Sequence, residues 1–398
     1  MPYDWPKTSA DMILVIADDI TGAAEMAGKA MEFGLSVGFL CSFDGSVKRI
    51  DTPDVLVVAT NSRSLAEPGA VRLHRRLLTE LSQTYSGPTI HFYKKCDSAV
   101  RGYVLSELIP MAEHTGISSV VLQPANPAAG RRIELGHYSI HDQPLHQSPF
   151  RTDPDFPATS SDVRQLLLAR SPRFAATPAF EYTLADCRSE EEMAQQLQPT
   201  GLTSHLYAGS TAFFGQYLKI VHRHVPAQVL PSVVARHEAE APYLLLSGSA
   251  HAGTYEMQQY FEEKGRPAIQ LPAELRQPAC SAEAIRTFAA RQVQTIIDSP
   301  GKSFMLSTGG PGETYPAAPE VLNQRLCRLA QLLVDKLSIE HIYISGGATT
   351  WQFISEMNWT SLVPVLSPAP GVIRLKVADR PGTSITIKPG SYAWGIAF

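Results

Sequence analysis

The sequence predicts an α/β protein with two domains, each built on a mainly parallel β-sheet flanked by helices. Short apolar runs alternate with segments whose apolar residues recur at helical spacing, which is the pattern of β-α units. This alternation occurs twice, on either side of a stretch at 225–242 that contains prolines and a charged turn. The length of 398 residues also exceeds the usual size of a single hydrophobic core. We therefore expect domains at 1–235 and 240–398.

In the first half, short apolar runs bounded by turn residues predict the strands. These runs are Met12–Ala17, Val37–Cys41, Val55–Ala59, Ile90–Tyr93 and Ser119–Gln123. Helical periodicity between them predicts helices at Pro68–Leu81 and Tyr103–His114, and a further helix that follows the first strand and ends at Gly34. From Gly136 to Ser161 the pattern gives way to a stretch rich in Pro, His and Asp. A long ordered loop of this kind is more often functional than idle.

The second half repeats the alternation, without a convincing sequence repeat. Its predicted strands are Tyr243–Ser247, Ala268–Leu271, Ser303–Ser307, His341–Ser345 and Ser384–Lys388. Its predicted helices are Thr254–Glu263, Ala282–Ile297, Glu320–Lys336 and Thr349–Glu356.

Composition excludes several classes of protein. A net charge of −4 gives no electrostatic reason to expect nucleic acid or an anionic membrane as partner. No apolar run approaches the roughly 18 residues of a membrane helix, and Met1–Trp5 does not have the pattern of a signal peptide. Five scattered cysteines support neither a disulfide framework nor a zinc site, so no metal ligands are assigned. We expect a cytoplasmic protein, and a homodimer is left open.

Two adjacent carboxylates, Asp18 and Asp19, lie where the first strand ends and its helix begins. Ligands of open α/β sheets bind at the carboxyl ends of the strands, so these acids are candidates for chemistry. The alternative is that one of them caps the helix. Capping needs one acid and not two side by side.

Further polar groups follow neighbouring strands. The run Lys94–Gly102 holds two lysines, an aspartate and an arginine, which could bind an anionic ligand, since Arg suits bidentate contact with a carboxylate. Asn61–Ser64 and Gln123–Pro127 occupy equivalent positions after their strands. Each could be an ordinary solvated loop, but four such strand ends in one domain favour a site.

In the second half, glycine-rich turns close the strands. Ser247–Ser249, Ser307–Gly310 and Ser345–Thr350 each follow a strand, and Lys388–Tyr392 adds a lysine beside another glycine turn. Glycine lets the backbone approach a phosphate, and free N–H groups at a helix start attract it. Singly these are most often plain turns; together they favour a nucleotide-sized anion site. The tripeptide Gly301–Ser303 mimics a P-loop but precedes its strand, so it is a false match.

The first half resembles the family of four-carbon acid sugar kinases, formerly a domain of unknown function. The family's Asp-Asp-x-Thr-Gly-Ala element matches Asp18 to Ala23, and its Lys-Lys-x-Asp-Ser-x-x-Arg-Gly element matches Lys94 to Gly102. Its Pro-x-x-Gly-Arg turn has a counterpart in Pro127 to Arg131, and its later Gly-Ser element is similar to Gly209-Ser210.

The second half carries the rest of the resemblance, which spans nearly the whole chain in order. The family's Ser-Gly-Ser, Gly-Gly-x-Thr and Lys-x-Gly turns match Ser247 to Ser249, Gly346 to Thr349 and Lys388 to Gly390. The resemblance implies an ATP-dependent kinase that phosphorylates a hydroxyl of threonate, erythronate or 3-oxo-tetronate. It implies an acid-binding N-terminal domain that faces a nucleotide-binding C-terminal domain across a cleft.

The roles follow as a hypothesis from the resemblance and from the needs of phosphoryl transfer. Asp19 or Asp97 would orient or deprotonate the acceptor hydroxyl, with Asp18 as a supporting ligand. Arg63, Lys95 and Arg101 would hold the acid's carboxylate. Mg²⁺ would arrive with ATP, bound largely by phosphates and water. The nucleotide would be held by Ser247, Ser249, Gly346, Gly347, Ala348, Thr349 and Gly390.

Departures from the family pattern leave alternatives open. Ala99 and Tyr103 replace the usual Thr and Asn and bear on the substrate, and Ala348 stands where an acid is common and bears on nucleotide or Mg²⁺ contact. A non-catalytic acid-binding or regulatory protein that kept the fold is the competing class. A dehydrogenase is weaker, because no Gly-x-Gly-x-x-Gly follows any strand.

Overall fold

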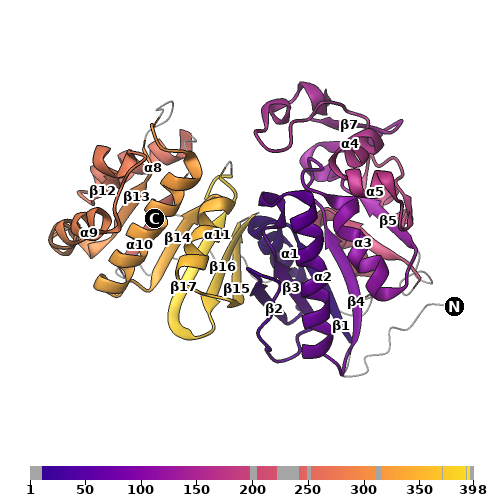
Figure 1. Cartoon of the computed structure of the whole chain (residues 1–398), viewed down its shortest axis with the longest axis horizontal. Coiled ribbons are helices and arrows are strands. Elements are labelled where there is room, and N and C mark those ends of the chain that lie inside the picture. The colour runs from indigo at the N-terminus through magenta and orange to yellow at the C-terminus, as the bar shows by residue number, and fades with distance from the viewer. Residues whose placement is uncertain are drawn as a thin grey trace. The chain divides into compact units, whose positions relative to one another are not determined.

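The computed structural model forms two compact units, Met1–Leu230 and Pro231–Phe398, and each is an α/β unit with a mainly parallel sheet flanked by helices (Figure 1). The predicted fold class is therefore confirmed. The gap between the predicted domains, 235–240, lies outside the described residues. The residues described are 11–197, 204–221, 242–248, 252–309, 315–369, 371–390 and 392–394.

The sheet of the first unit is parallel throughout, in the order β2-β3-β1-β4-β10-β5-β9. All five predicted strands are present: β1, β2, β3 and β5 are nearly continuous apolar runs buried on both faces, and β4 is buried toward its carboxyl end. The two strands that were not predicted, β9 and β10, are short. The bounds are β1 (Asp11–Ala17), β2 (Val37–Cys41), β3 (Val55–Ala59), β4 (Thr89–Lys95), β5 (Ser119–Gln123), β9 (Glu181–Thr183) and β10 (Leu206–Gly209).

Helices of this unit pack in pairs, α1 beside α7 and α2 beside α3. The segment predicted as a loop from Gly136 to Ser161 is instead partly regular, because β6, β7 and β8 form a small antiparallel sheet that begins before it. These strands are too short to show a period of two in the sequence. The bounds are α1 (Ile20–Glu32), α2 (Glu67–Thr84), α3 (Val104–Thr115), α4 (Val163–Arg170), α5 (Pro172–Ala176), α6 (Glu190–Gln195), α7 (Thr211–Val221), β6 (Arg131–Glu134), β7 (His137–Ile140) and β8 (Gln143–Pro144).

The second unit has the strand order β12-β13-β11-β14-β17-β16-β15, parallel up to β17 and antiparallel beyond it. The five predicted strands and four predicted helices are present, but β15 and β16 were missed. Pro364 and Pro368 lie within β15, and proline in an apolar run argues against a strand. The bounds are β11 (Tyr243–Ser247), β12 (Ala268–Gln270), β13 (Phe304–Ser307), β14 (His341–Ser345), β15 (Ser361–Ala369), β16 (Val372–Val377), β17 (Arg380–Lys388), α8 (Ala252–Glu263), α9 (Ala282–Ile297), α10 (Pro319–Leu337) and α11 (Gly347–Glu356).

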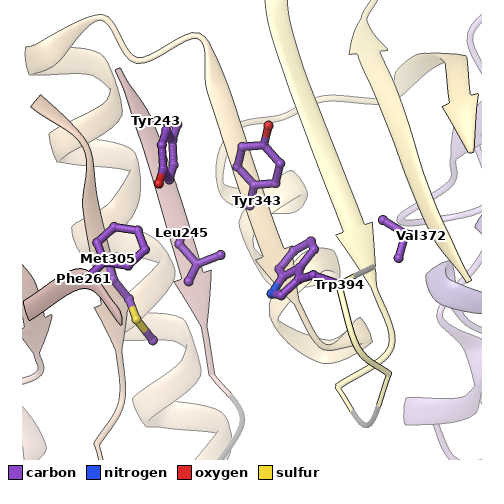
Figure 2. Close-up of a cluster of buried hydrophobic side chains, with 7 residues drawn as sticks. All are labelled: Tyr243, Leu245, Phe261, Met305, Tyr343, Val372 and Trp394. Carbon is purple, nitrogen blue, oxygen red and sulfur yellow. The ribbon is translucent and has the colours of Figure 1, made fainter. Parts of the chain in front are cut away.

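An aromatic cluster forms part of the core of the second unit (Figure 2). Tyr343 on β14 meets Tyr243 and Trp394 edge-on, with ring centroids 5.6 and 5.8 Å apart. Such geometry adds about 0.5–1.5 kcal/mol per pair beyond the area that is buried. The cluster therefore anchors the chain after β17 against the sheet.

Among the described residues, no helix is both long and apolar enough to span a bilayer.

A buried ion pair ties the sheet of the first unit to α3. The Lys94 ammonium on β4 lies 2.9 Å from a Glu107 carboxylate oxygen, and both side chains are 1% exposed. Ser62 donates to the other Glu107 oxygen at 2.6 Å. Burial alone would raise the pKa of Glu107, but Lys94 and the nearby His74 outweigh it and lower the pKa. Both charges are therefore kept inside the protein.

We predict that Glu107→Ala lowers the free energy of unfolding by about 3–5 kcal/mol, because it leaves the Lys94 ammonium buried without its counter-ion. Glu113→Ala is the matched control, since Glu113 lies on the same helix and pairs with Arg75 at the surface. An exposed pair contributes at most about 1 kcal/mol. Denaturant unfolding of the two variants gives the comparison, and equal losses would contradict the assigned role of the buried pair.

Candidate functional site

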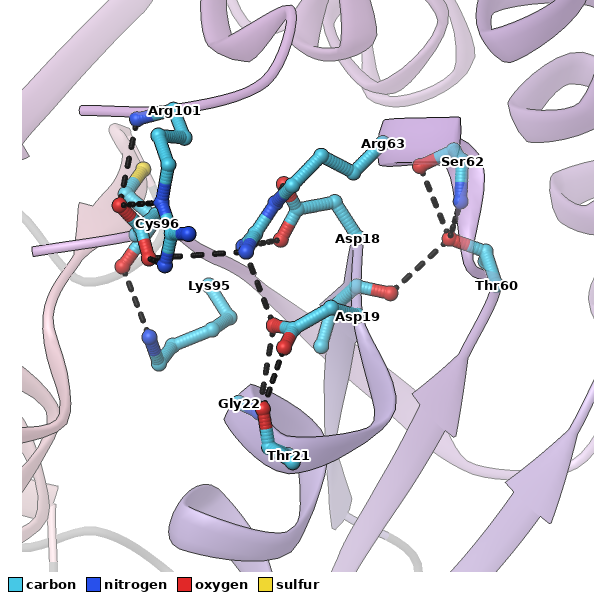
Figure 3. Close-up of polar contacts among 12 residues, drawn as sticks. Asp18, Asp19, Thr21, Gly22, Thr60, Ser62, Arg63, Lys95, Cys96 and Arg101 are labelled. Carbon is cyan, nitrogen blue, oxygen red and sulfur yellow. Dashed lines mark hydrogen bonds and ion pairs between the residues drawn. The ribbon is translucent and has the colours of Figure 1, made fainter. Parts of the chain in front are cut away.

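One arginine gathers the acids at the strand ends of the first unit. Arg63 binds Asp18 through two hydrogen bonds of 2.8 Å, from Nε and Nη2 (Figure 3). Its Nη2 also donates to Asp19 at 3.1 Å, and its Nη1 lies 3.6 Å from Asp97. The strand register explains the meeting, because Ala17 at the end of β1 pairs with Ala59 on β3 and Lys95 on β4. The residues that follow these strands therefore share one edge of the sheet.

The paired acids have different structural roles. Asp19 is the N-cap of α1, where its carboxylate accepts a hydrogen bond from Gly22 N at 3.2 Å and another from the Thr21 hydroxyl. The capping interpretation is thus correct for Asp19. Asp18 is buried, and its carboxylate accepts two hydrogen bonds from the guanidinium of Arg63. The side chain of Asp19 is 18% exposed and that of Asp18 only 3%.

Asp97 is the centre of the loop that follows β4. Its carboxylate accepts from Arg101 Nε at 3.0 Å and Nη2 at 2.9 Å, and from the backbone N–H of Ala99 at 2.9 Å. Burial alone would raise the pKa of Asp97, but Arg101 and Arg63 outweigh it and hold the pKa well below its ordinary value. Asp97 is therefore firmly ionised and a weak proton acceptor.

The backbone of this loop is held in a strained shape. Val100 has φ = +62°, a region that β-branched residues rarely adopt, and Gly102 has φ = +88°. Arg170 on α4 donates to the carbonyl of Val100 at 2.7 Å and to that of Ala99 at 3.2 Å. This role could not be predicted from the sequence, because Arg170 lies about seventy residues further along the chain and matches no motif.

Lys95 and Glu25 complete this side of the site. The Lys95 ammonium donates to the carbonyl of Cys96 at 2.8 Å, and the residue is 4% exposed. Glu25 on α1 accepts a hydrogen bond from Thr211 at 3.1 Å. Burial raises the pKa of Glu25, and Lys95 opposes that rise. Sequence reasoning missed Glu25, and its position one turn after Gly22 on the same helix was the only signal.

In the second unit a pocket of about 230 Å³ opens at the strand ends. The register places Ser247 on β11 beside Ser345 on β14, and Ser345 beside Lys388 on β17. Lys388 Nζ donates to Ser345 Oγ at 2.9 Å and lies 5.2 Å from the centre of the Trp394 ring. Burial lowers the pKa of Lys388 to about 8. Leu245, Met257, Met305 and Trp394 form an apolar wall.

The predicted nucleotide-binding residues fall into three groups. Ser247 and Gly390 line the pocket. The run Gly346–Thr349 forms the start of α11, directly after the pocket residue Ser345, with Gly346 at φ = +101°, Gly347 as the first helical residue, Ala348 exposed and Thr349 buried. Ser249 lies outside the described residues. Gly248 is required for packing, because a Cβ there would collide with Thr349 Oγ1.

Comparison with known proteins also divides the chain into two parts. A model described as "Sugar-binding N-terminal domain" matches residues 13–205, and one described as "Nucleotide-binding C-terminal domain" matches 244–392. A D-threonate kinase of Bordetella bronchiseptica is 25% identical over 75% of this chain and 82% of its own length. A 3-oxo-tetronate kinase of Cupriavidus necator is 22% identical over 95% and 93%. The chain belongs to the four-carbon acid sugar kinase family.

Other family members match over less of their length. A D-threonate kinase of Salmonella typhimurium is 30% identical, but the match spans 44% of this chain and 40% of that protein. Solved structures with the same fold match nearly the whole chain. A crystal structure from Haemophilus influenzae, of the family DUF1537, superposes with a TM-score of 0.68 at 19% identity, covering 96% of this chain and 97% of that one. One from Salmonella typhimurium gives 0.72 at 18%, covering 96% of each.

We predict that Gly102→Ala disturbs the acid cluster. A Cβ at Gly102 would lie 2.5 Å from Asp18 Oδ2, so the carboxylate held by Arg63 must move. Gly116→Ala is the matched control, because Gly116 has a similar φ of +71° but open space around its Cβ position. Both substitutions carry backbone strain of about 1–3 kcal/mol. Thermal melting should show a larger loss for Gly102→Ala, and equal losses would contradict the packing role.

Proposed function

We propose that this protein is an ATP-dependent kinase that phosphorylates a hydroxyl of a four-carbon sugar acid such as threonate, erythronate or 3-oxo-tetronate. The observation that carries the proposal is the pair of strand-end sites: a cluster of carboxylates and guanidiniums in the sugar-binding unit, and a lysine-containing pocket in the nucleotide-binding unit. Relatives that are named D-threonate kinase, 3-oxo-tetronate kinase and D-erythronate kinase support it.

In the first unit, Asp19 is proposed as the base that orients and deprotonates the acceptor hydroxyl. Asp18 is less suited, because both its oxygens receive the guanidinium of Arg63, whereas only one oxygen of Asp19 does. Asp97 is less suited because its low pKa makes it a weak proton acceptor. The side chain of Asp19 is also the most exposed of the three, at 18% against 3% and 11%. Asp18 then supports the site by fixing Arg63.

The predicted contact of Arg63, Lys95 and Arg101 with the acid's carboxylate remains a proposal. Lys95 is the best placed of the three, because its ammonium donates to a neutral carbonyl oxygen, that of Cys96. The guanidiniums of Arg63 and Arg101 each already bind an aspartate of the chain. All three cations lower the electrostatic cost of bringing an anionic acid beside three aspartates.

In the second unit, Lys388 is proposed to bind the phosphates of ATP, together with the hydroxyls of Ser247 and Ser345 and the start of α11. A helix N-terminus attracts phosphate through its free N–H groups. The apolar wall of the pocket fits the base. Ser249, the Gly346–Thr349 turn and Gly390 keep the contacts with the nucleotide that the resemblance implies.

Mg²⁺ fits this site only as a companion of the nucleotide. The described residues hold no group of three side chains that could bind a metal ion. Mg²⁺ usually keeps several waters and binds through substrate phosphates with one or two carboxylates, and Glu256 is a carboxylate residue that lines the pocket. When bound, it would neutralise charge on the phosphates. Phosphoryl transfer then depends mostly on positioning, which the chain's own residues supply.

An ATP-consumption screen over four-carbon sugar acids tests the function. We expect turnover with at least one of threonate, erythronate and 3-oxo-tetronate, and stabilisation of the protein by Mg-ATP in thermal melting. A protein that is stabilised by an acid but not by Mg-ATP, and that consumes no ATP, would be an acid-binding module instead.

We predict that Asp19→Asn lowers kcat by about 10²–10⁴, the usual contribution of a general base, while ATP affinity is unchanged. Asn also caps helices well, so the helix start should survive. Asp162→Asn is the matched control, because Asp162 caps α4 through the same kind of hydrogen bond. Turnover of Asp19→Asn equal to that of the control would remove Asp19 from the role of base.

We also predict that nucleotide affinity falls as the pH rises through about 8, because burial lowers the pKa of Lys388 to about that value. The protonated ammonium attracts phosphate, so binding is strongest below the pKa and weakens above it. Lys388→Met should bind ATP weakly and without this pH dependence. Lys376→Met, at an exposed position on β16, serves as control. Calorimetry at pH 7 and 9 makes the comparison, and a Lys388→Met variant with the same pH profile as wild type would contradict it.

A further inference from the structure

The guanidiniums that the sequence assigned to the acid are already bound to the chain. Arg63 gives both arms of its fork to Asp18. Arg101 gives its fork to Asp97, and its Nη1 lies 3.4 Å from Asp153. The Nε and Nη2 donors of both arginines are therefore already used within the chain. Besides Lys95, whose hydrogen bond goes to a neutral carbonyl oxygen, a guanidinium with no carboxylate partner in the chain would suit the carboxylate of a sugar acid.

Arg131, the first residue of β6, is such a group. Its Nη1 donates to the Ser98 hydroxyl, which lies on the site loop between Asp97 and Ala99. Within the part of the chain that the structure describes, no carboxylate pairs with Arg131. Its guanidinium lies 5.9 Å from the centre of the Phe150 ring, and that of Arg101 lies 5.3 Å from the same centre. Two cations against one ring favour an anion beside them.

Arg131 and Ser98 are also held firmly in place. Asn126 and Arg131 exchange two backbone hydrogen bonds, of 2.9 and 3.0 Å. Tyr138 on β7 donates its hydroxyl to the carbonyl of Ser98 and also lies 3.3 Å from that of Pro124. The small antiparallel sheet therefore fixes this arginine against the loop that carries Asp97. A guanidinium that is preorganised in this way loses little entropy when it binds a planar carboxylate.

We propose that Arg131, together with the Ser98 hydroxyl, binds the carboxylate of the sugar acid and selects acids over neutral sugars. Arg63 and Arg101 then act by positioning Asp18 and Asp97. This assignment rests on the proposed function only in that a sugar acid binds in the first unit; it does not require that the acid is phosphorylated.

Calorimetry with the full-length protein tests the assignment, with threonate and erythronate as acids and their primary amides as uncharged probes. Wild type should prefer the acids. Arg131→Ala should weaken acid binding about 10- to 100-fold, the effect of losing charge-assisted hydrogen bonds, and leave amide binding unchanged. Arg131→Lys should be intermediate, because it keeps the charge and loses the fork.

Arg132→Ala is the matched control, since Arg132 is the adjacent residue, is exposed and lies 3.4 Å from Asp142. It should bind acids as wild type does, and thermal melting of all variants shows whether they are folded. The assignment is overturned if Arg131→Ala binds acids like wild type, if it loses acids and amides equally, or if wild type binds none of the acids. An active kinase with an unaffected Arg131→Ala variant keeps the proposed function and loses only this subsite.

Discussion

The acid cluster of the first unit depends on the contact between Arg63 and the carboxylates around it. Asp18, Asp19 and Asp97 come from two strand ends, and without a cation between them they would repel one another in a poorly solvated place. The guanidinium of Arg63 lies between the three carboxylates and fixes their spacing. Beneath this layer, Lys94 and Glu107 repeat the principle with full burial. At this edge of the sheet, carboxylates are therefore paired with cations both in the acid cluster and in the buried pair of Lys94 and Glu107.

The second unit has the same parallel architecture, but the charge at its strand ends is a single lysine instead of a cluster of paired charges. Parallel register lines up Ser247, Ser345 and Lys388 at one edge of the sheet. The Lys388 ammonium donates hydrogen bonds to neutral oxygens of Ser345, Pro389 and Gly390. Its charge is therefore uncompensated by these contacts, and its pKa falls accordingly. One unit presents carboxylates that are already balanced, and the other presents a cation that a polyanion would balance.

The sequence predicted those parts of the fold that local patterns determine. Buried strands such as Val55–Ala59 and Tyr243–Ser247 are continuous apolar runs and were found with their correct ends. β15 was hidden by its prolines, and β6 to β8 by their shortness. In the candidate site, the sequence predicted which motif residues lie together but not which contact each of them makes. The cap by Asp19 is a local contact, but the pairing of Asp18 is with Arg63, more than forty residues away, and no local pattern reports such a contact.

Because Trp394 lies in the wall of the pocket, its fluorescence can report on that pocket. Its indole lies in the wall of the pocket, against Tyr343 on one side and near the Lys388 ammonium on another. A ligand that draws this ammonium toward its phosphates changes the electric field at the ring and hence the light it emits. Trp359, in contrast, is buried against Phe353 and does not line the pocket. In a variant that keeps Trp394 and replaces the other tryptophans, fluorescence can therefore follow occupancy of the pocket without a dye or a label.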